Sequence, residues 1–330
     1  MSMSETATPL LQVKDLKVHF PVANGVWGQV TESVKAVDGI SFDLHRGETF
    51  SLVGESGCGK STTALAVLRM LEITQGRIHF EGEDVTDFTQ AELRPLRRRM
   101  QMVYQDPFAS LNPRMKVGEI IGEPLVVHQL QGDRTAFKNR ISELMDIVGL
   151  LPDMASRYPH EFSGGQRQRV GIARALALNP DLLICDEAVS ALDVSIQAQI
   201  LNLLMDLQSE LSLTYLFIAH DLSVVRHISD RVGVMYLGRL VEVASAKNLF
   251  NSPQHPYTQG LLSAVPVADP EVESTRPQQL IIGEVPSVRN PPPGCRFHPR
   301  CPLADQECSN TQPELLSTDG GEVACFKVGG

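Results

Sequence analysis

The sequence predicts an α/β fold, in which one main domain is followed by a smaller C-terminal one. Apolar segments of strand character at residues 50–54 and 181–186 alternate with segments of helical spacing at 61–72 and 195–211. Such alternation is typical of a sheet covered by helices. A chain of 330 residues also exceeds the usual size of one domain, which favours an appended second part.

The N-terminal part is predicted to be rich in strands. In residues 34–44, Ile40, Phe42 and Leu44 alternate with more polar positions, the period of a half-buried strand. Further segments have strand character on the same grounds: 13–20, 77–82 and 100–105. We therefore expect an antiparallel β subdomain at the start of the chain.

Between Gln105 and Ser163 the pattern changes to a helical one. Apolar residues recur at helical spacing in this interval: Phe137, Ile141, Leu144, Met145 and Val148. The α/β pattern then resumes, with a helix at 166–178, a strand at 214–220 and a hairpin at 231–244. This predicts a helical subdomain at about 107–172 inside a main domain that spans 1–252.

Beyond about residue 252 the sequence is rich in proline and its periodicity fades. We interpret 253–330 as a linker and a small C-terminal module without regular structure. Few apolar residues would tie this module to the rest of the chain, so we expect it to be separable from the main domain.

Charge and composition limit the classes of function. Lys plus Arg number 29 against 39 Asp plus Glu, a net charge of −10, which speaks against a nucleic-acid partner. No run of about 18 apolar residues and no N-terminal signal pattern occur, so we expect a chain that is neither secreted nor membrane-spanning. The six cysteines are then expected to be reduced thiols or metal ligands.

The segment GESGCGKST at residues 54–62 fits the pattern of a phosphate-binding loop, G-x-x-x-x-G-K-[ST]. It follows an apolar strand and opens a helix, so backbone N–H groups and the helix N-terminus can hold phosphate oxygens. Lys60 would reach the terminal phosphates, and Ser61 would supply a hydroxyl to Mg²⁺. The predicted ATP-binding residues here are Gly54, Glu55, Ser56, Gly57, Cys58, Gly59, Lys60, Ser61 and Thr62. The alternative interpretation is a glycine-rich turn with a surface lysine.

Two carboxylates, Asp186 and Glu187, directly follow the apolar residues LLIC of the predicted strand at 181–186. Parallel α/β sheets bind ligands at the carboxyl ends of their strands. In a protein with a phosphate loop, Asp186 would hold Mg²⁺ and Glu187 would act on the attacking water as general base. The alternative is an acidic strand end exposed to solvent.

Residues 162–176, FSGGQRQRVGIARAL, resemble the signature of the ABC ATPase family. Three further features occur in the family's order: Gln105 after MVY, SALD at 190–193, and His220 at the end of TYLFIAH. The resemblance implies an ABC-type P-loop NTPase. A plain P-loop kinase would have no use for SGGQ.

The resemblance also implies a head-to-tail dimer of nucleotide-binding domains with two ATP molecules between them. Gln105 would contact ATP and Mg²⁺, and His220 would join Glu187 as a catalytic residue. The signature residues Ser163, Gly164, Gly165 and Gln166 would contact the ATP bound by the partner. Phe20 is in the position where the family stacks an aromatic ring on adenine, with a core phenylalanine as the alternative.

One departure from the family pattern follows the catalytic carboxylate. The family commonly has proline after this glutamate, whereas Ala188 and Val189 follow Glu187 in this chain. The substitution leaves the carboxylate in place and puts the rigidity of the loop in question.

Almost the whole chain resembles the ATP-binding subunits of oligopeptide/dipeptide importers, a family that includes glutathione and nickel importers. The matching segments are 104–114, 157–169, SALDVSIQAQILNLLMDLQ, HDLSVV, VMYLGRLVE, HPYTQGLLSAVP and PPPGCRFHPRCP. The resemblance implies a peripheral subunit on the cytoplasmic face of the inner membrane. Its partners would be a second ATP-binding subunit, two membrane-spanning permeases and an extracytoplasmic substrate-binding protein. The cargo would be a peptide, with nickel or glutathione as alternatives. The main rival is a soluble ABC ATPase that acts on nucleic acid or ribosomes.

Four of the six cysteines lie close together in the C-terminal tail: Cys295, Cys301, Cys308 and Cys325. A metal could supply the cohesion that a small core cannot. Zinc sites usually contain C-x-x-C, which is missing, and iron–sulfur clusters tolerate more varied spacing. The resemblance to importer subunits implies a [4Fe–4S] cluster, and four scattered thiols are the alternative. We interpret Cys58 and Cys185 as packing residues.

Overall fold

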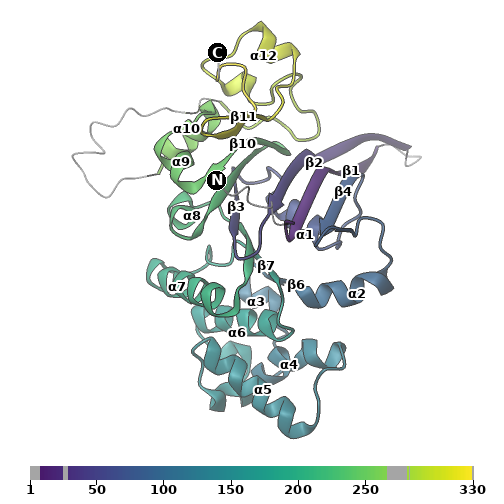
Figure 1. Ribbon diagram of the computed structural model, residues 1–330, viewed down its shortest axis with the longest axis vertical. Helices are drawn as coiled ribbons and strands as arrows, with labels where there is room; N and C mark the ends of the chain where they lie inside the picture. Colours follow the sequence, from purple (N-terminus) through teal and green to yellow (C-terminus); the bar gives the residue numbers. More distant parts are fainter. Residues whose placement is uncertain (1–7, 25–28, 266–280, 282, 329–330) are drawn as a thin grey trace, which may run out of the picture. The chain divides into compact units, whose positions relative to one another are not determined.

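The computed structural model describes residues 8–24, 29–265, 281 and 283–328, and the chain divides into two compact units. One unit combines Met1–Asp87 with Ala219–Gly330, so both ends of the chain contribute to it. The other is the continuous segment Phe88–Ile218. Figure 1 follows the two units by colour, with the first in purple, green and yellow and the second mainly in teal.

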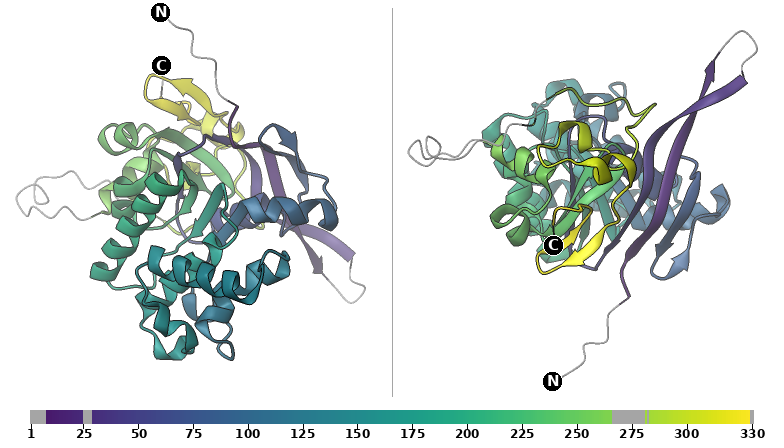
Figure 2. Two further views of the ribbon diagram at one scale, coloured as in Figure 1. Left: turned by 60° about the horizontal axis from the view of Figure 1, so that its bottom comes forward. Right: turned by 90° about the horizontal axis from the view of Figure 1, so that it is seen from above.

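The first unit begins with a four-stranded antiparallel sheet in the order β2-β1-β4-β5. Its strands are β1 (Leu11–Asn24), β2 (Gln29–Leu44), β4 (Gln75–Phe80) and β5 (Glu83–Asp84). Figure 2 shows β1 and β2 as a long pair that extends well beyond the shorter strands. Ile40, Phe42 and Leu44 are all buried, which confirms the alternation predicted for β2.

A second sheet contributes the strands β3-β9-β10-β12-β11, in that order, to the same unit. Its first three strands are β3 (Thr49–Val53), β9 (Arg231–Tyr236) and β10 (Arg239–Ser245), with β3 parallel to β9. The hairpin between β9 and β10 turns at Leu237 and Gly238, whose φ angles of 43° and 83° suit a tight two-residue turn. The hairpin predicted at 231–244 is confirmed.

The C-terminal tail extends this second sheet. Strand β12 (Gly321–Val323) pairs with β10 on one side and with β11 (Leu316–Thr318) on the other. Val323 and Ala324 are buried, and the Ala324 N–H donates to the Val241 carbonyl over 2.9 Å. The expectation of a tail without regular structure is therefore wrong. Strands of three residues are too short to produce a periodic signal in the sequence.

The helices among the described residues of the first unit are short. They are α1 (Lys60–Val67), α8 (Leu222–Ile228), α9 (Ala246–Asn251), α10 (Pro256–Ser263) and α12 (Gln306–Asn310), with the 3-10 turn η3 (His298–Arg300). Helix α1 is shorter than the predicted 61–72 because Arg69 has a φ of 54°, which ends the helical path. Helix α10 starts with Pro256, and its N-cap His255 accepts a hydrogen bond from the Tyr257 N–H.

The second unit contains parallel strands in the order β8-β7-β6. They are β6 (Met100–Val103), β7 (Leu182–Asp186) and β8 (Thr214–Ile218). Every residue of β7 and β8 is buried, as expected of strands covered on both faces. The segments of strand character predicted at 181–186 and 214–220 correspond to these two strands.

Helices make up most of the second unit. They are α2 (Gln90–Arg99), α3 (Pro107–Ser110), α4 (Val117–Val127), α5 (Arg134–Ile147), α6 (Gly164–Leu176) and α7 (Val194–Leu211), with the 3-10 turns η1 (Pro152–Ser156) and η2 (Pro159–Glu161). Ile141, Leu144 and Met145 form the buried face of α5, as their spacing predicted. Helix α6 packs against α3, α4, α5 and α7. Within the described ranges, no helix is both long and apolar enough to cross a membrane.

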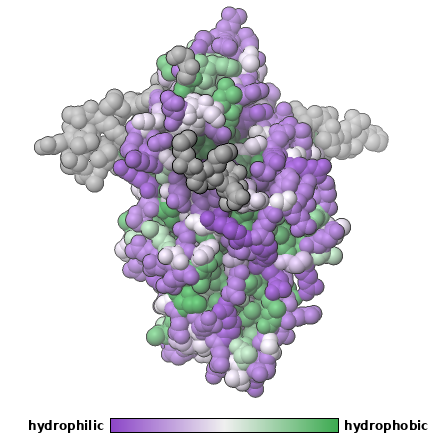
Figure 3. Space-filling view, viewed as in Figure 1, coloured by the Kyte–Doolittle hydropathy of each residue, from purple (hydrophilic) through white to green (hydrophobic). Residues whose placement is uncertain are grey.

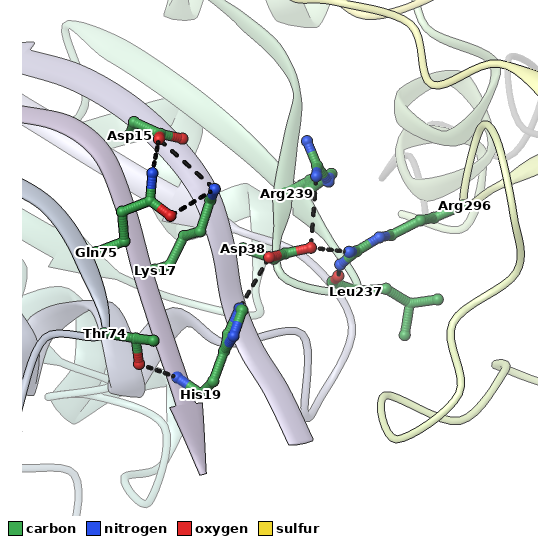
Figure 4. A network of polar contacts seen from close by, with 9 residues as sticks. All are labelled: Asp15, Lys17, His19, Asp38, Thr74, Gln75, Leu237, Arg239 and Arg296. Carbon is green, nitrogen blue, oxygen red and sulfur yellow. Dashed lines mark hydrogen bonds and ion pairs between the residues drawn. The ribbon is translucent and has the colours of Figure 1, made fainter. Parts of the chain in front are cut away.

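A buried ionic network in the first unit is centred on Asp38 of β2 (Figure 4). His19 Nε2 lies 2.8 Å from Asp38 Oδ1, Arg239 reaches Oδ2 at 3.4 Å, and Arg296 of the tail also pairs with Oδ2. Burial acts to raise the pKa of Asp38, but the charge of Arg296, the bond with His19 and the charge of Arg239 outweigh it and hold the pKa below the usual value. Arg296 also donates to the Leu237 carbonyl, so one side chain fastens the tail to both β2 and the hairpin turn.

The Asp38 network predicts a pH-dependent loss of stability in Arg296→Met. Removing one partner of a buried pair should lower the free energy of unfolding by on the order of 3 kcal/mol at pH 7. Because the folded pKa of Asp38 is lowered, the pair stabilises fully above the unfolded pKa of about 3.9 and is lost as pH falls through the folded value. Urea unfolding at pH 7, 4 and 3 should therefore show a difference from wild type that is nearly constant down to about pH 4 and narrows at pH 3. Lys247→Met, an exposed change of equal charge, is the control, and a difference independent of pH would contradict the assignment.

Candidate functional site

The phosphate-binding loop between β3 and α1 adopts a backbone that needs glycine at two positions. Gly54 has a φ of 150°, and a Cβ built on it would lie 2.1 Å from the Met235 carbonyl oxygen. Gly59, the N-cap of α1, has a φ of 109°, and its Cβ would lie 2.1 Å from the Ala36 carbonyl oxygen. The loop is thus pressed against the backbone of β2 and β9, where a larger residue has no room.

The side chain of Lys60 lies inside the loop. Its residue is 5% exposed, and Nζ donates to the carbonyls of Gly54 at 2.7 Å and Glu55 at 3.1 Å. The ammonium group is therefore surrounded by the loop backbone, which excludes the alternative of a surface lysine. Ser61 and Thr62 follow in the first turn of α1, where the helix N-terminus favours anions.

The remaining loop residues divide into exposed and buried ones. Ser56 and Gly57 are exposed, whereas Cys58 is buried at 3% exposure. Burial raises the pKa of the Cys58 thiol, and burial likewise raises the pKa of Cys185 in β7 to about 12. Both cysteines are thus neutral packing residues, as predicted.

Two carboxylates mark the end of β7 in the second unit. Asp186, the last residue of the strand, is 8% exposed, and Glu187 follows with a φ of 47°. Gln105, just after β6, donates from Nε2 to Glu187 Oε2 over 2.6 Å. A left-handed backbone at a non-glycine residue is uncommon and is concentrated at functional sites. The structure therefore brings Gln105 and Glu187 together, as a shared catalytic role would require.

The loop after Glu187 is held by hydrogen bonds although it lacks proline. The N–H and the hydroxyl of Ser190 both donate to the Glu187 carbonyl, at 3.1 and 3.0 Å. Gln197 donates to the Val189 carbonyl at 2.9 Å, and Ala188 and Val189 are buried. These contacts fix the loop after Glu187. Local hydrogen bonds therefore supply the rigidity that the missing proline had put in question.

The SGGQ segment forms the start of α6. Ser163 is the N-cap, its hydroxyl accepts from the Gln166 N–H at 3.3 Å, and Gln166 Oε1 accepts from the Ser163 N–H at 3.0 Å. A Cβ on Gly165 would lie 2.4 Å from Ile196, and one on Gly164 would lie 3.3 Å from Leu192. Small residues therefore let the start of α6 pack closely on the segment that carries SALD.

Phe20 and His220 are both exposed residues of the first unit. Phe20 lies in β1 and is 40% exposed, so it is not a core phenylalanine. His220 directly precedes Asp221, the N-cap of α8. The predicted site residues thus fall into two groups, because Gln105, Asp186, Glu187 and the SGGQ segment belong to the second unit.

The prediction that the tail is separable from the phosphate loop is wrong. Arg300 of the tail pairs with the carboxylate of Glu55 at 2.7 and 3.0 Å, and the Glu55 N–H donates to the Tyr257 hydroxyl at 2.9 Å. Phe297 packs against Tyr236 and Tyr257, with ring centroids 5.3 Å apart in both pairs. A buried aromatic cluster and an ion pair therefore join the tail to the loop.

The sequence alone predicts no individual role for Arg300, Tyr257 or Phe297. The segments that carry them, HPYT and CRFHPRC, matched the importer family, and this was the available signal. The match could not reveal a contact with Glu55, which lies 245 positions earlier in the chain than Arg300.

The four tail cysteines act on one another electrostatically, but in this structure they are not arranged as a metal-coordinating group. Burial raises the pKa of Cys295 to about 11, and Cys308, Cys301 and Cys325 act on it in the same direction. The Cys295 N–H donates to the Cys308 carbonyl at 2.8 Å. Across the described residues, however, no group of three or more His, Cys, Asp or Glu is arranged to hold a metal ion. The structure does not support the predicted metal-holding module.

The order of these features is that of an ATP-binding cassette, since SGGQ opens the helix that precedes the strand of Asp186. Residues 37–190 match the ABC transporter family, and residues 241–308 match the C-terminal region of oligopeptide/dipeptide transporters. A dimeric ATP-binding cassette solved with ADP and Pi has a TM-score of 0.64 and 27% identity, covering 72% of this chain and 98% of that one. The class of protein is therefore an ABC-type ATPase.

Curated relatives match this chain over nearly its full length and theirs. The chain is 52% identical over 318 residues to the putative oligopeptide transport ATP-binding protein YkfD of Bacillus subtilis, with 96% of this chain and 95% of that protein covered. It is also 52% identical to the oligopeptide transport ATP-binding protein OppF of Salmonella typhimurium, with 97% and 96% covered. The chain belongs to the family of ABC transporter ATP-binding subunits whose C-terminal region is of the oligopeptide/dipeptide type.

The loop geometry predicts unequal effects of alanine at two glycines that share a positive φ. Gly54→Ala should lower the free energy of unfolding by about 3 kcal/mol or more, because its Cβ meets a backbone carbonyl that cannot move aside. Gly57→Ala should lower the free energy of unfolding by about 1 kcal/mol, because the added Cβ meets nothing within 4 Å and only the φ of 79° is unfavourable. Urea denaturation measures the free energy of unfolding of both variants. Equal losses of stability would contradict the close approach of Gly54 to the Met235 carbonyl.

Proposed function

We propose that this chain binds and hydrolyses MgATP to power the import of peptides through a membrane transporter. The observation that carries the proposal is the contact between Gln105 and Glu187 at the end of β7, in a chain whose Lys60 is enclosed by a phosphate loop. Relatives that are about half identical over nearly the whole length are named for oligopeptide transport, which supports a peptide cargo.

In the proposed mechanism, Glu187 is the general base. Its carboxylate accepts the proton of the attacking water, and the amide of Gln105 orients that carboxylate through the bond between their side chains. Lys60 and the N–H groups at the start of α1 hold the phosphates and stabilise the charge that develops on them. His220 would assist as a second catalytic residue, and Phe20 would stack on adenine.

The proposed Mg²⁺ ligands fit this ion chemically. Ser61, Gln105 and Asp186 offer a hydroxyl, an amide and a carboxylate oxygen, and Mg²⁺ prefers oxygen ligands. When bound, the ion would neutralise charge on the phosphates. Two of these residues are fixed at the ends of β6 and β7, so their positions follow from the sheet.

The proposal includes a second ATP-binding subunit, most simply a different chain. Ser163, an exposed N-cap at the start of a helix of 13 residues, together with Gly164, Gly165 and Gln166, would complete the ATP site of that partner. The structural relative bound to ADP and Pi is itself dimeric, which supports pairing.

Membrane-spanning permeases and an extracytoplasmic binding protein would complete the transporter. Figure 3 shows hydrophobic patches between hydrophilic residues over the region of α4 to α6. Phe108, Val127 and Leu151 of the second unit are more than half exposed, which supports a protein partner on this unit. The chain would then be peripheral to the cytoplasmic face of the membrane.

Glu187→Gln should lower ATP turnover by about 10² to 10⁴, while MgATP binding persists, because the amide cannot accept the proton. The measurement is phosphate release by the transporter complex, with binding measured by calorimetry on the same preparation. Lys60→Ala is the comparison variant and should lose binding itself. Turnover of Glu187→Gln at the wild-type rate would refute the assignment of the base, and co-purification with nucleic acid instead of permeases would refute the transport role.

We also propose that the four tail cysteines bind a [4Fe–4S] cluster. Thiolates are the ligands of such clusters, and the mutual influence of Cys295, Cys301, Cys308 and Cys325 supports their proximity. Ligation would require loss of the protons that the raised pKa values of Cys295, Cys301 and Cys325 retain.

Anaerobically purified protein should be brown with about four iron atoms per chain, because thiolate-to-iron charge transfer absorbs visible light. Replacing any one of the four cysteines with serine should remove the colour, whereas Cys185→Ser should retain it. Elemental analysis decides the question, since zinc in place of iron would indicate a zinc site and no metal would leave four free thiols.

A further inference from the structure

Glu55 is the one acidic residue in the phosphate loop at 54–62. Its carboxylate carries the same charge as the phosphates that the loop is proposed to bind, and it sits one residue after Gly54. An uncompensated carboxylate in such a position repels an anionic ligand. The loop therefore needs something that neutralises this charge.

Arg300 of the C-terminal tail pairs with the Glu55 carboxylate and compensates its charge. Its Nη1 lies 2.7 Å from Glu55 Oε2 and its Nη2 lies 3.0 Å from Oε1, so the two groups pair through both nitrogens and both oxygens. The Arg300 side chain is 7% exposed and that of Glu55 is 25% exposed, which limits screening by solvent. The bond with Glu55 raises the pKa of Arg300 further, so the guanidinium remains charged.

The position of Arg300 is itself fixed by neighbours of the first unit. It ends the η3 turn, its Nη1 lies 3.4 Å from the Tyr236 hydroxyl, and Phe297 at the start of this turn is 2% exposed. On the other side of the pair, the Tyr257 hydroxyl accepts the Glu55 N–H. Both the side chain and the backbone of Glu55 are thus held by residues from the C-terminal third of the chain.

We propose that Arg300 is a positioning residue for ATP binding: it neutralises the Glu55 carboxylate and fixes its direction, so that the phosphate loop can accept an anionic ligand. The inference rests on the proposed binding of MgATP. It assigns to the tail a direct part in the electrostatics of the nucleotide site. If the pair served only to anchor the tail, removing the Glu55 carboxylate would not restore the ATP binding that is lost with Arg300.

A double-mutant cycle on the full-length chain separates these two roles. The four proteins are wild type, Arg300→Met, Glu55→Gln and the double variant, and the measured quantity is the Kd for MgATP by calorimetry. Arg300→Met should weaken binding about tenfold, equivalent to about 1.4 kcal/mol. Adding Glu55→Gln should restore the Kd to within about threefold of wild type, because no unpaired carboxylate is left. Arg289→Met, an exposed loss of the same charge in the tail, is the matched control and should bind as wild type does.

Each result decides between the interpretations. Unchanged binding by Arg300→Met, or an equally weak double variant, would overturn the proposal, whereas failure of wild type to bind MgATP would refute the proposed function itself. If Arg300→Met does not fold, Arg300→Lys replaces it in the cycle, with a loss of about threefold that Glu55→Gln should reverse. Absence of this reversal would overturn the proposal as well.

Discussion

The structure of the first unit depends on how closely the phosphate loop approaches the backbone around it. Gly54 lies against the Met235 carbonyl and Gly59 against the Ala36 carbonyl, with no room for a Cβ at either place. The Gly238 N–H of the hairpin turn donates to the Cys58 carbonyl at 2.9 Å and fixes the loop from a third direction. A loop held by backbone on all these sides keeps its N–H groups oriented before any ligand arrives, and such preorganisation is what makes anion binding effective.

Local patterns predicted much of this arrangement. The glycine spacing at 54–62, the apolar run before Asp186 and the SGGQ start of α6 are each contained within about a dozen residues, where periodicity and motif spacing are readable. The predictions of strands at 13–20, 34–44 and 50–54 and of a hairpin at 231–244 were confirmed for the same reason. The predicted helix at 61–72 was longer than α1. Arginine ordinarily favours a helix, so the residue type at position 69 gave no sign of the left-handed backbone that ends α1 there.

The C-terminal tail is the part of the structure that the sequence predicted least well. Its strands are three residues long, and its main attachments join residues far apart in the chain, such as Arg296 with Asp38 and Phe297 with Tyr236. A single sequence contains no signal for such pairs, and a region rich in proline resembles a linker by composition alone. Likewise, the contact of Gln105 with Glu187 depended on two parallel strands lying side by side, which the motifs suggested but could not place to within hydrogen-bonding distance.

The discontinuous make-up of the first unit also affects how the chain is made. The second unit is continuous, so all of its residues are present once Ile218 has been synthesised, whereas β3 in residues 1–87 pairs with β9, which is made after that segment. At ordinary translation rates the ribosome needs on the order of ten seconds to cross the intervening segment. During that interval β3 lacks its neighbour β9, so one strand edge stays unpaired while the rest of the chain is being made.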